Sequence, residues 1–532
     1  MKKLTRFCMG ALIATGATMM LTACASDDTL AENPTEPVNP TEQTFTMTVE
    51  AARGEDNALA RALAAAGMTD GTTNRALKLD NETKTLTGTW TKGDAVKVLG
   101  IDEEKMAIET VGTLYAQSDG TATTLDGTLD KTPQRFLIDP DDNEYSPLIL
   151  IYPRYPYDYT GQKGTLADIA ANYDYNTYYA DEWTEKDGKI SIPGTAAFYN
   201  TSQSIIRFTL KDKAGKAIKV KNLTLHDDNN RILTSVDFTE TDYVQDDLTV
   251  NLDEASSEVW VALCATDKVN LTLTADGEDG HQYTFTRNEV LFDLGKFYTI
   301  SVKMNKIVDL SKLKGNYEAQ DGEVLTGTLG GNYKVSVADG AKVTLRNVTI
   351  NGTNNSSYDW AGLTCDGDAE ITLEGTNTLR GFYKTQPGLF IAENKTLTIK
   401  GNGSLTASPF DGGTNNSWAA GIGGGHGIKC GNIVIEGGTI TANGGYWAAG
   451  IGGGPSTPGC GSITIKNTVT KVTATSNNND NSTTIGFGYP GSCGTVTIGG
   501  TVYWDYNATT EKYEFKNGGE TYLRKNPLVY EP

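Results

Sequence analysis

The stretch Val343-Thr-Leu-Arg-Asn347 is the first of six related phrases between residues 341 and 503. The other five are Ile371-Thr-Leu-Glu-Gly375, Leu397-Thr-Ile-Lys-Gly401, Ile433-Val-Ile-Glu-Gly437, Ile463-Thr-Ile-Lys-Asn467 and Val496-Thr-Ile-Gly-Gly500. Their first residues are 28, 26, 36, 30 and 33 positions apart. A period of that size with one short strand per repeat is typical of a solenoid.

Each position within the phrase has a physical interpretation. The first and third residues are always aliphatic, which indicates the buried face of a strand with period two. The second residue is Thr in five of six phrases, a β-former suited to the outer face. The fifth is always Asn or Gly, which tolerate a left-handed backbone at a sharp bend. The repeats therefore predict a parallel β-helix, which we place at residues 306–532.

The fourth position of the phrase alternates in charge along five repeats, as Arg346, Glu374, Lys400, Glu436 and Lys466. Stacked strands lie about 4.8 Å apart, so we expect opposite charges to face one another on the solvent side. Each such pair is worth under about 1 kcal/mol. We interpret the row as a device that fixes strand register, not as a catalytic cluster.

A second repeat lies between the phrases, where Trp418-Ala-Ala-Gly-Ile-Gly-Gly-Gly425 recurs as Trp447-Ala-Ala-Gly-Ile-Gly-Gly-Gly454. Trp360 occupies an earlier, related segment. This region resembles the right-handed β-helix domains of surface adhesins and pectin-binding proteins. An aromatic row on a solenoid can stack sugar rings, and alternatively each Trp packs inward over the small residues that follow it. The candidate ligand-binding residues are Trp360, Trp418, Tyr446 and Trp447.

Three cysteines also keep the repeat. Cys430, Cys460 and Cys493 each precede a glycine and the next phrase, which predicts one shared position on successive coils. The sequence leaves two arrangements open, a ladder of free thiols or a disulfide between adjacent coils. There is no C-x-x-C pair, so we do not expect a zinc site.

Composition and charge narrow the functional class. The chain has 532 residues, enough for more than one domain, and its 59 glycines and 25 tyrosines without long apolar helical patterns favour an all-β protein. Its formal net charge is −21, and the isoelectric point is about 4.7. A nucleic-acid partner is not expected, since it needs a basic face.

The first residues have the pattern of an export signal. Met1-Lys2-Lys3 is basic, Met9–Leu21 is apolar, and Leu21-Thr-Ala-Cys24 has the form of a lipobox. The resemblance to bacterial lipoprotein signals implies that residues 1–23 are removed and that Cys24 carries a diacylglyceryl thioether and palmitate. Asp27 and Asp28 resemble the surface-export signal of outer-membrane lipoproteins. The alternative is an ordinary signal peptide with a chance cysteine.

Residues 24–43 are polar and rich in proline, so we interpret them as a flexible tether. Thr44–Glu50 alternates cleanly and predicts a strand. Beyond the signal, no stretch is apolar over 18 residues, so we expect no transmembrane helix.

Six motifs occur in a recognisable order between Thr44 and Asn305. They are Asn74-Arg-Ala-Leu77, Thr89–Val96, Gly161–Leu166, Tyr173-Asp-Tyr175, Phe198–Leu210 and Phe292–Met304. Together they resemble the fimbrillin-like family, the subunits of protease-matured (type V) pili. The resemblance implies two tandem β-sandwiches, which we place at residues 76–195 and 196–305, after a propeptide at residues 44–75.

The residues alone agree with an all-β organisation, because short apolar or alternating segments are separated by turn residues at sandwich spacing. Tyr152-Pro-Arg-Tyr-Pro-Tyr-Asp-Tyr159 is an aromatic and proline-rich loop. It suits either packing at a domain junction, which we favour, or a surface that binds a sugar or partner.

The family resemblance also implies an assembly mechanism. An Arg-specific protease removes the first strand, here Thr44–Glu50, and a neighbouring subunit's strand fills the groove by β-augmentation. Arg75-Ala76 is the preferred cut, with Arg53 and Arg61 as rivals. The alternative is that these are ordinary surface arginines and the lipoprotein stays whole.

The order of domains then suggests a position in the fibre. A stalk subunit ends in a strand that it donates, but here a long solenoid follows the sandwich region. We therefore expect a tip subunit that adheres through the β-helix to a host or bacterial glycan or protein. The alternative is that Tyr513–Pro532 is a donor strand, although such residues also cap solenoids. Before maturation the lipid on Cys24 holds the chain at the outer membrane, with the fimbrium as its destination.

We find no catalytic constellation, cofactor motif or metal motif in the sequence. The loop acids Asp359, Asp366, Asp368 and Asp411 can bind Ca²⁺, but loops of this composition are usually turns. Two other functions stay open: a stand-alone outer-membrane lipoprotein that binds glycans, and, with less support, a polysaccharide lyase.

Overall fold

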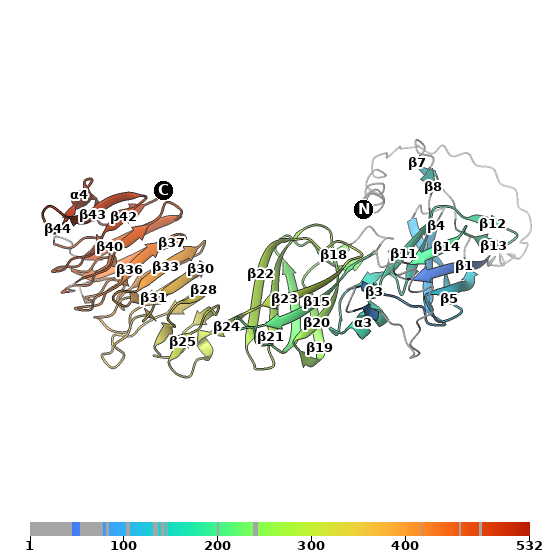
Figure 1. Cartoon of the computed structure of the whole chain (residues 1–532), viewed down its shortest axis with the longest axis horizontal. Coiled ribbons are helices and arrows are strands. Elements are labelled where there is room, and N and C mark those ends of the chain that lie inside the picture. The colour runs from blue at the N-terminus through green and yellow to red at the C-terminus, as the bar shows by residue number, and fades with distance from the viewer. Residues whose placement is uncertain are drawn as a thin grey trace, which may run out of the picture. The chain divides into compact units, whose positions relative to one another are not determined.

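The computed structural model describes residues 45–53, 78–80, 85–102, 107–130, 133, 137–139, 144–145, 147–198, 202–237, 243–414, 416–456, 459–477 and 481–532 (Figure 1). Cys24, Arg61, Arg75 and Ala76 lie outside these residues. The chain divides into two compact units, and we describe each by itself. Unit 1 comprises Met1–Lys211, Ala217–Asp279 and Phe285–Val302, and unit 2 comprises Asp212–Lys216, Gly280–Thr284 and Lys303–Pro532. Within the described residues, no helix is long and apolar enough to cross a membrane.

The first part of unit 1 is a nine-stranded sheet with the order β11-β9-β4-β5-β6-β1-β13-β12, in which β14 also pairs with β1. The strands are β1 (Phe45–Arg53), β4 (Ala95–Asp102), β5 (Ala107–Ala116), β6 (Ala122–Leu129), β9 (Leu148–Tyr152), β11 (Asn176–Ala180), β12 (Thr184–Lys186), β13 (Lys189–Ser191) and β14 (Thr195–Phe198). Two small pairs stand apart, β2 (Lys78–Asp80) with β3 (Thr85–Thr87) and β7 (Leu137–Asp139) with β8 (Glu144–Tyr145).

This sheet encloses its own core. Strands from across the sheet contribute buried side chains to one cluster, including Met47, Leu114, Leu150 and Phe198, and Trp90, just before β4, belongs to the same cluster. Tyr178 on β11 packs on Phe198 of β14 with ring centroids 6.1 Å apart, so distant parts of the sheet approach one another. We predicted a sandwich of two facing sheets here, whereas nine of the described strands form one continuous sheet that curls. The strong right-handed twist of strands permits this closure.

The second part of unit 1 has two sheets. One has the order β10-β17-β20-β15-β23, with β18 on β17, and the other contains β16, β19, β21 and β22. The strands are β10 (Tyr157–Asp158), β15 (Ser204–Lys211), β16 (Val220–Asp227), β17 (Ile232–Val236), β18 (Tyr243–Gln245), β19 (Leu248–Ser256), β20 (Glu258–Ala265), β21 (Val269–Asp276), β22 (Gln282–Val290) and β23 (Phe297–Lys303). A short helix, α3 (Leu166–Asn172), is capped by the Thr165 side chain, which accepts a hydrogen bond from the Asp168 amide.

The aromatic and proline-rich loop joins the two parts of unit 1. Tyr157 pairs with Val236 through β10 and β17. Tyr152, Tyr157 and Tyr159 are each at most 2% exposed, and the Tyr159 hydroxyl donates to the Ser202 carbonyl. The loop tyrosines therefore pack at a junction, the arrangement that we favoured over a binding surface.

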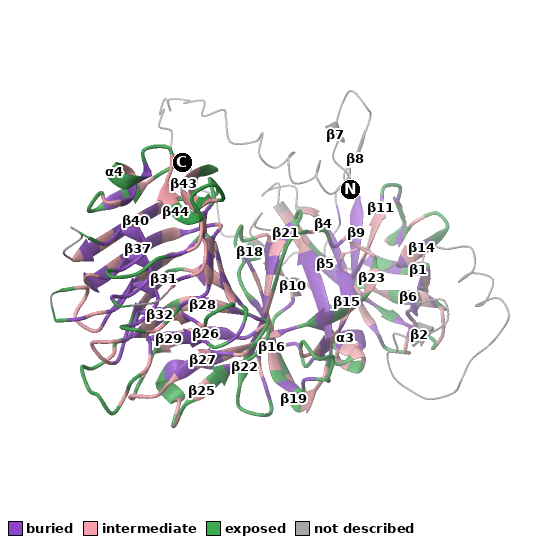
Figure 2. Cartoon of the chain, turned by 60° about the vertical axis from the view of Figure 1, so that its left-hand side comes forward, coloured by how far each residue is buried: buried purple, intermediate pink, exposed green. Residues whose placement is uncertain are grey.

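Unit 2 is built from three ladders of parallel strands, and the chain visits them in turn (Figures 1 and 2). Ladder 1 is β26 (Val324–Thr328), β28 (Ala341–Ile350), β30 (Ala369–Glu374), β33 (Thr396–Gly401), β36 (Asn432–Ile435), β39 (Ile463–Ile465) and β42 (Val496–Ile498). Ladder 2 is the end of β28 with β31 (Thr376–Arg380), β34 (Ser404–Ser408), β37 (Thr439–Tyr446) and β40 (Lys471–Asn477). Ladder 3 is β25 (Tyr317–Ala319), β27 (Val335–Val337), β29 (Leu363–Cys365), β32 (Leu389–Ile391), β35 (Ile422–Gly423), β38 (Ile451–Gly452) and β41 (Ile485–Gly486).

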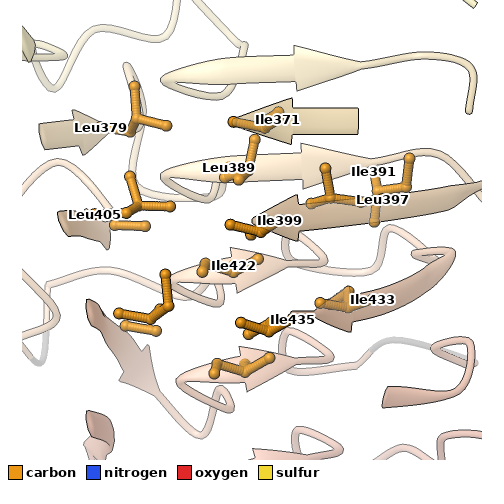
Figure 3. Close-up of a cluster of buried hydrophobic side chains, with 14 of the residues drawn as sticks. Ile371, Leu379, Leu389, Ile391, Leu397, Ile399, Leu405, Ile422, Ile433 and Ile435 are labelled. Carbon is orange, nitrogen blue, oxygen red and sulfur yellow. The ribbon is translucent and has the colours of Figure 1, made fainter. Parts of the chain in front are cut away.

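Aliphatic side chains fill the space between the ladders. Figure 3 shows Ile371, Ile399 and Ile435 above one another in one column, and Leu379 above Leu405 in another. All five are fully buried. Figure 2 shows the buried faces of these strands in purple, with exposed green residues mainly in the connecting loops. The first and third positions of the six phrases thus face inward, as their pattern predicted.

The register of ladder 1 departs from the sequence pattern at one step. Val343 lies opposite Ile371, and Leu397 opposite Ile433, as aligned phrases require. Between them, however, Ala369 lies opposite Leu397, a shift of two residues. An even shift keeps every side chain on its own face, so the core survives it.

The charged row changes with that shift. Arg346 Nε lies 2.6 Å from Glu374 Oε2, and Lys466 pairs with Glu436 at 2.5 Å, as predicted. The predicted contact between Glu374 and Lys400 is wrong, because Lys400 Nζ instead lies 2.7 Å from Glu370 Oε1. The two-residue shift brings Glu370 opposite Thr398, two residues nearer to Lys400 than aligned phrases would place it.

The predicted left-handed bends occur in four of the six phrases. Asn347, Gly375, Gly401 and Gly500 have positive φ, whereas Gly437 and Asn467 do not. After Gly437 the left-handed residue is Gly438 instead, with φ of 81°.

The Trp-Ala-Ala-Gly-Ile-Gly-Gly-Gly repeat has a steric explanation. Gly423 and Gly452 hold the same position on successive coils, with φ of 129° and 130°. A Cβ added to Gly423 would lie 2.0 Å from the Gly452 carbonyl oxygen, so only glycine fits.

The two ends of unit 2 are covered by other elements. Gln282–Thr284 of β22 pairs with β24 (Asn305–Asp309), which precedes the short helix η1 (Leu310–Lys312) and pairs with β26. The last elements are β43 (Thr501–Asn507), β44 (Lys512–Phe515), α4 (Gly519–Leu523) and β45 (Leu528–Tyr530). Strand β45 pairs antiparallel with β40, and its Leu528 is fully buried.

Candidate functional site

Strand β1 lies in the interior of the nine-stranded sheet. On one side it runs antiparallel to β6, from Phe45 opposite Leu129 to Ala52 opposite Ala122. On the other side it runs parallel to β13 and then to β14 (Figure 1). Removal of β1 would therefore leave two strand edges with unpaired backbone groups, separated by a gap the width of one strand.

The side chains of β1 alternate between core and solvent along its whole length. Phe45, Met47, Val49 and Ala51 are each at most 4% exposed, while the residues between them face outward or lie partly covered. Each fully buried Phe, Met or Val contributes about 1.5–3 kcal/mol. The strand therefore completes the core that the other strands share, and its outward face is polar.

The last residue of β1, Arg53, also lies on the buried face of the strand and carries a positive charge. Arg53 is 5% exposed, and among the described residues it is the only buried arginine, lysine or histidine. Its Nη2 donates to Asp174 Oδ2, and its Nη1 donates to the Thr89 carbonyl oxygen at 2.8 Å. The guanidinium carbon lies 4.2 Å from the Tyr152 ring centroid and 5.3 Å from that of Trp90.

Two carboxylates accompany this guanidinium in the interior. Asp174 and Asp94 are each 2% exposed. Asn176 donates to Asp174 Oδ1, and the Tyr152 hydroxyl donates to Asp94 Oδ2 at 3.1 Å. Burial raises the pKa of the Asp174 carboxyl, while Arg53 and Asn176 oppose the rise and Asp94 adds to it.

The three candidate cleavage arginines are thus placed differently. Arg53 is buried and ion-paired, so its side chain is not offered to a protease in the folded chain. Arg61, Arg75 and Ala76 fall in residues 54–77, outside the described residues. The lipidation site Cys24 also lies outside them.

Of the aromatic row in unit 2, Trp360 has the clearest structural role. It packs against the core, with Tyr358 at 5.3 Å and Phe382 at 5.8 Å between ring centroids. Its Nε1 is buried. Its ring contacts are those expected of a side chain that packs on the core, and ligand binding at this residue stays a prediction.

Trp418 and Trp447 are partly buried, as Trp360 is. Lys384 Nζ lies 4.8 Å from the Trp418 ring centroid, and Trp447 contacts Tyr446 and the exposed Tyr489 at 4.7 and 5.7 Å. These side chains therefore keep accessible ring surface on adjacent coils, which suits stacking on a sugar or a partner.

The cysteines resolve one open alternative. Cys430 and Cys460 form a disulfide between adjacent coils, with their Cα atoms 4.7 Å apart. Cys493 follows on the next coil, pairs with Cys460 through a backbone bridge and keeps a buried free thiol. Burial raises the pKa of the Cys493 thiol well above its ordinary value.

The loop acids that we considered for Ca²⁺ are each engaged within the chain. Asp359 accepts from Gln386 at 2.8 Å, and Lys334 donates to Asp366 at 2.9 Å. Asp368 accepts from the Thr396 amide at 2.7 Å. Burial opposes ionisation of Asp411, but hydrogen bonds from Thr414, Ser417 and Gly413 lower its pKa. These contacts suit loops that are held as turns.

The Arg53 cluster was not predicted from the sequence. Its components lie in two motifs that we noted only as family marks, Thr89–Val96 and Tyr173-Asp-Tyr175. The sequence offered one sign of this cluster, the acidic residue Asp174 within an aromatic motif. Its partner Arg53 is 121 residues away in the chain, so the pair could not be recognised.

Comparisons with known proteins add structures but no family. No protein-family model matches the chain, and no curated protein matches it. A fimbrial protein from Bacteroides ovatus is 14% identical with a TM-score of 0.21, and the match covers 42% of this chain. It covers 46% of that protein, so this chain spans less than half of that protein's length.

Two further structures are similar over comparable lengths. A candidate cell adhesion protein from Bacteroides uniformis is 16% identical with a TM-score of 0.25, covering 41% of this chain and 90% of that one. The shaft pilin of Lactobacillus rhamnosus GG is 9% identical with a TM-score of 0.19, covering 48% and 97%. Because these TM-scores lie below 0.5, we base the functional proposal on this chain's own contacts.

Proposed function

We propose that this chain is a subunit of a surface fimbrium, assembled by replacement of β1 with a strand from a neighbouring subunit. The observation that carries the proposal is the place of β1 inside the sheet. An inserted strand that pairs on both sides and supplies one row of core side chains leaves a groove of matching shape when it departs.

The cut that releases β1 falls after Arg75 or Arg61 in this proposal. A protease specific for arginine must take the side chain into its own pocket. Arg53 is held by Asp174 and by two aromatic rings, so it does not meet that requirement in the folded chain. Residues 54–77 link β1 to the next described strand. A cut there breaks the covalent link between β1 and the rest of the sheet, while the hydrogen bonds of β1 stay in place until it is exchanged.

The position that we propose in the fibre is the tip. Unit 2 is a parallel β-helix in this proposal, supported by its three parallel ladders. Its strand β45 is already paired with β40 and buries Leu528, so it is not free for donation. A subunit that accepts a strand and presents a solenoid ends the fibre and carries its adhesive surface.

The lipid on Cys24 would hold the uncut chain at the outer membrane and be lost with the propeptide. Adhesion would use the partly exposed rings of Trp418, Trp447 and Tyr446 to bind a glycan or protein. The same surface supports the second candidate, an anchored glycan-binding lipoprotein that is never cut. The lyase alternative has no supporting observation in the described residues.

The test uses single and double variants of the full chain, each expressed in the cells that produce the protein. Arg75→Ala and Arg61→Ala, singly and together, are compared with Arg154→Ala, an arginine in unit 1 that lies outside the linker. Sheared surface fibres are probed for the subunit. The proposal predicts that the double variant stays with the membrane and is absent from fibres, while Arg154→Ala is incorporated. Normal incorporation of the double variant would overturn the proposal.

A separate experiment tests whether the aromatic surface binds glycans, which both candidate functions require. Binding to a glycan array is measured with the protein and with Trp418→Ala and Trp447→Ala. Trp360→Ala serves as a structural comparison, since that ring packs on the core. Loss of glycan binding in the first two variants supports the adhesive surface, and unchanged binding removes these residues from it.

A further inference from the structure

The pocket that holds the Arg53 side chain belongs entirely to the part of the sheet that would remain after β1 leaves. The Thr89 carbonyl, the Trp90 and Tyr152 rings and the Asp174 carboxylate all lie outside β1. A departing β1 therefore takes the occupant away and leaves the pocket in place.

The pocket is shaped for a planar cation. The Trp90 and Tyr152 rings both lie within cation–π range of the guanidinium, a carboxylate accepts from one of its nitrogens and a carbonyl oxygen accepts from another. A Cβ added to Gly88 would lie 3.1 Å from Arg53 Nη2, so the backbone there approaches the guanidinium directly. A larger residue at position 88 would press on the bound cation.

The carboxylate of Asp174 makes the empty pocket unfavourable. Asp174 is almost fully buried, and its ion pair is with Arg53. A carboxylate in the interior is tolerated only when it is paired and hydrogen-bonded. Removing one partner of such a pair costs far more than the pair itself contributes.

We propose that the incoming strand must bring an arginine or lysine into this pocket. The inference rests on the strand replacement proposed above and specifies its partner: a β-strand of another subunit with apolar residues at the positions of Phe45, Met47, Val49 and Ala51, and a cation two residues further on. Arginine fits better than lysine, because its planar fork matches the carboxylate and the ring faces.

The charge thus selects among strands that are equally apolar. An alternating apolar strand that ends in a neutral or acidic residue fits the groove but leaves Asp174 unpaired. The acceptor then discriminates by the penalty for the wrong partner as well as by the attraction for the right one.

The test measures strand exchange on the full chain after a single cut in residues 54–77 by an arginine-specific protease. A fluorescent peptide of residues 44–54 is offered in excess, and its retention on the protein is followed by size exclusion. Competing peptides carry Arg53→Lys, Arg53→Gln or, as a matched control on the exposed face, Glu50→Gln. We expect Arg53→Gln to compete about 100-fold less well, or worse.

The Glu50→Gln peptide should stay within about fivefold of the native peptide, because the hydrogen bond that Glu50 accepts from Thr124 is exposed to solvent. The Arg53→Lys peptide should compete less well than the native peptide and better than the Arg53→Gln peptide. Equal competition by the native and Arg53→Gln peptides overturns the cation requirement and leaves strand replacement intact. Failure of the native peptide to exchange at all, when the cut is complete, overturns strand replacement and the cation requirement together.

A variant of the acceptor chain completes a double-mutant cycle with the peptide variants. With Asp174→Asn, the difference between the native and Arg53→Gln peptides should shrink to less than about tenfold, because the charge that penalises glutamine is gone. If the difference persists at its full size, Asp174 is not the source of the selectivity. The peptide series on the unchanged acceptor decides the inference even where this variant folds poorly.

Discussion

Arg53 and Asp174 form a buried ion pair between the last residue of β1 and the short connection that joins α3 to β11. The side chains are 3% and 2% exposed, and 121 residues separate them in the chain. The pair fixes the end of β1 with a charged contact, where the preceding positions use apolar ones. Its two halves lie on opposite sides of the proposed cleavage segment.

This pair should dominate the stability of β1 in the uncut chain. Arg53→Met keeps the length of the side chain but leaves Asp174 without its cation, and we expect unit 1 to lose about 3–5 kcal/mol. Urea unfolding followed by tryptophan fluorescence reports it, since Trp90 lies beside the pair. Glu50→Gln is the control on the exposed face and should cost less than about 1 kcal/mol. A loss for Arg53→Met no larger than the control's would show that the ion pair does not hold the strand.

A buried asparagine, Asn377, should stabilise unit 2 through its hydrogen bonds. Asn377 is fully buried, accepts from the Val348 amide at 2.9 Å and donates to the Glu374 and Ser404 carbonyls at 3.1 Å each. Leu405 holds the same position on the next coil, so leucine fits there sterically.

Asn377→Leu should therefore destabilise unit 2 by about 1–3 kcal/mol, because the Val348 amide loses its partner. The matched control is Asn354→Leu at an exposed position, which should change the free energy of unfolding by less than about 0.5 kcal/mol. Urea unfolding of both variants checks the prediction. Equal effects at the two positions would mean that the hydrogen bonds of Asn377 contribute nothing net.

The disulfide between Cys430 and Cys460 closes a loop of 30 residues. In the chain-entropy model, a loop of that size stabilises the folded state by about 3.6 kcal/mol. Reduction, or Cys430→Ser with Cys493→Ala to prevent re-pairing, should lower the Tm of unit 2 in calorimetry. Cys493→Ala alone retains the bond and should change the Tm much less. A Tm that is indifferent to reduction would contradict the proposed contribution.

One histidine should make unit 1 more stable in mild acid. The Asp247 hydrogen bond at 2.6 Å is the largest cause that raises the pKa of His226, and Asp228 at 3.3 Å raises it further. Because the folded pKa lies above the unfolded one, the stabilisation is full below the unfolded pKa and disappears as the pH rises through the folded pKa.

The Tm gap between the protein and His226→Gln should therefore be wider at about pH 5.5 than at about pH 9. Thermal melts at both pH values measure it. The groups are partly exposed, so high salt should narrow the gap at the lower pH. A gap that stays constant with pH would show that protonation of His226 is not linked to folding.

Much of unit 2 was predictable from sequence because its rule is local. Each phrase states its own buried face, and Gly423 and Gly452 mark where adjacent coils approach too closely for a side chain. The shift between β30 and β33 was not predictable, since an even shift leaves the pattern of buried residues unchanged. The partner of Lys400 was therefore predicted wrongly.

Unit 1 was less predictable, because its decisive contacts are remote. Arg53 follows two alanines and precedes a glycine, which by composition favours a loop. Only the pairing of β1 with β14 places it beside Trp90 and Tyr152, and no local pattern announces Asp174 as its partner. These long-range contacts made the burial of Arg53 unpredictable from the sequence, and they also keep its side chain inaccessible to a protease.

The measurement that tests the central claim most directly is N-terminal sequencing of the protein recovered from the cell surface. If β1 is removed for assembly, the chain should begin at Ala76 or Ala62, and the peptide that carries Phe45–Arg53 should be absent from it. If every recovered chain begins at a blocked, lipidated Cys24 and retains β1, strand replacement does not occur in this protein.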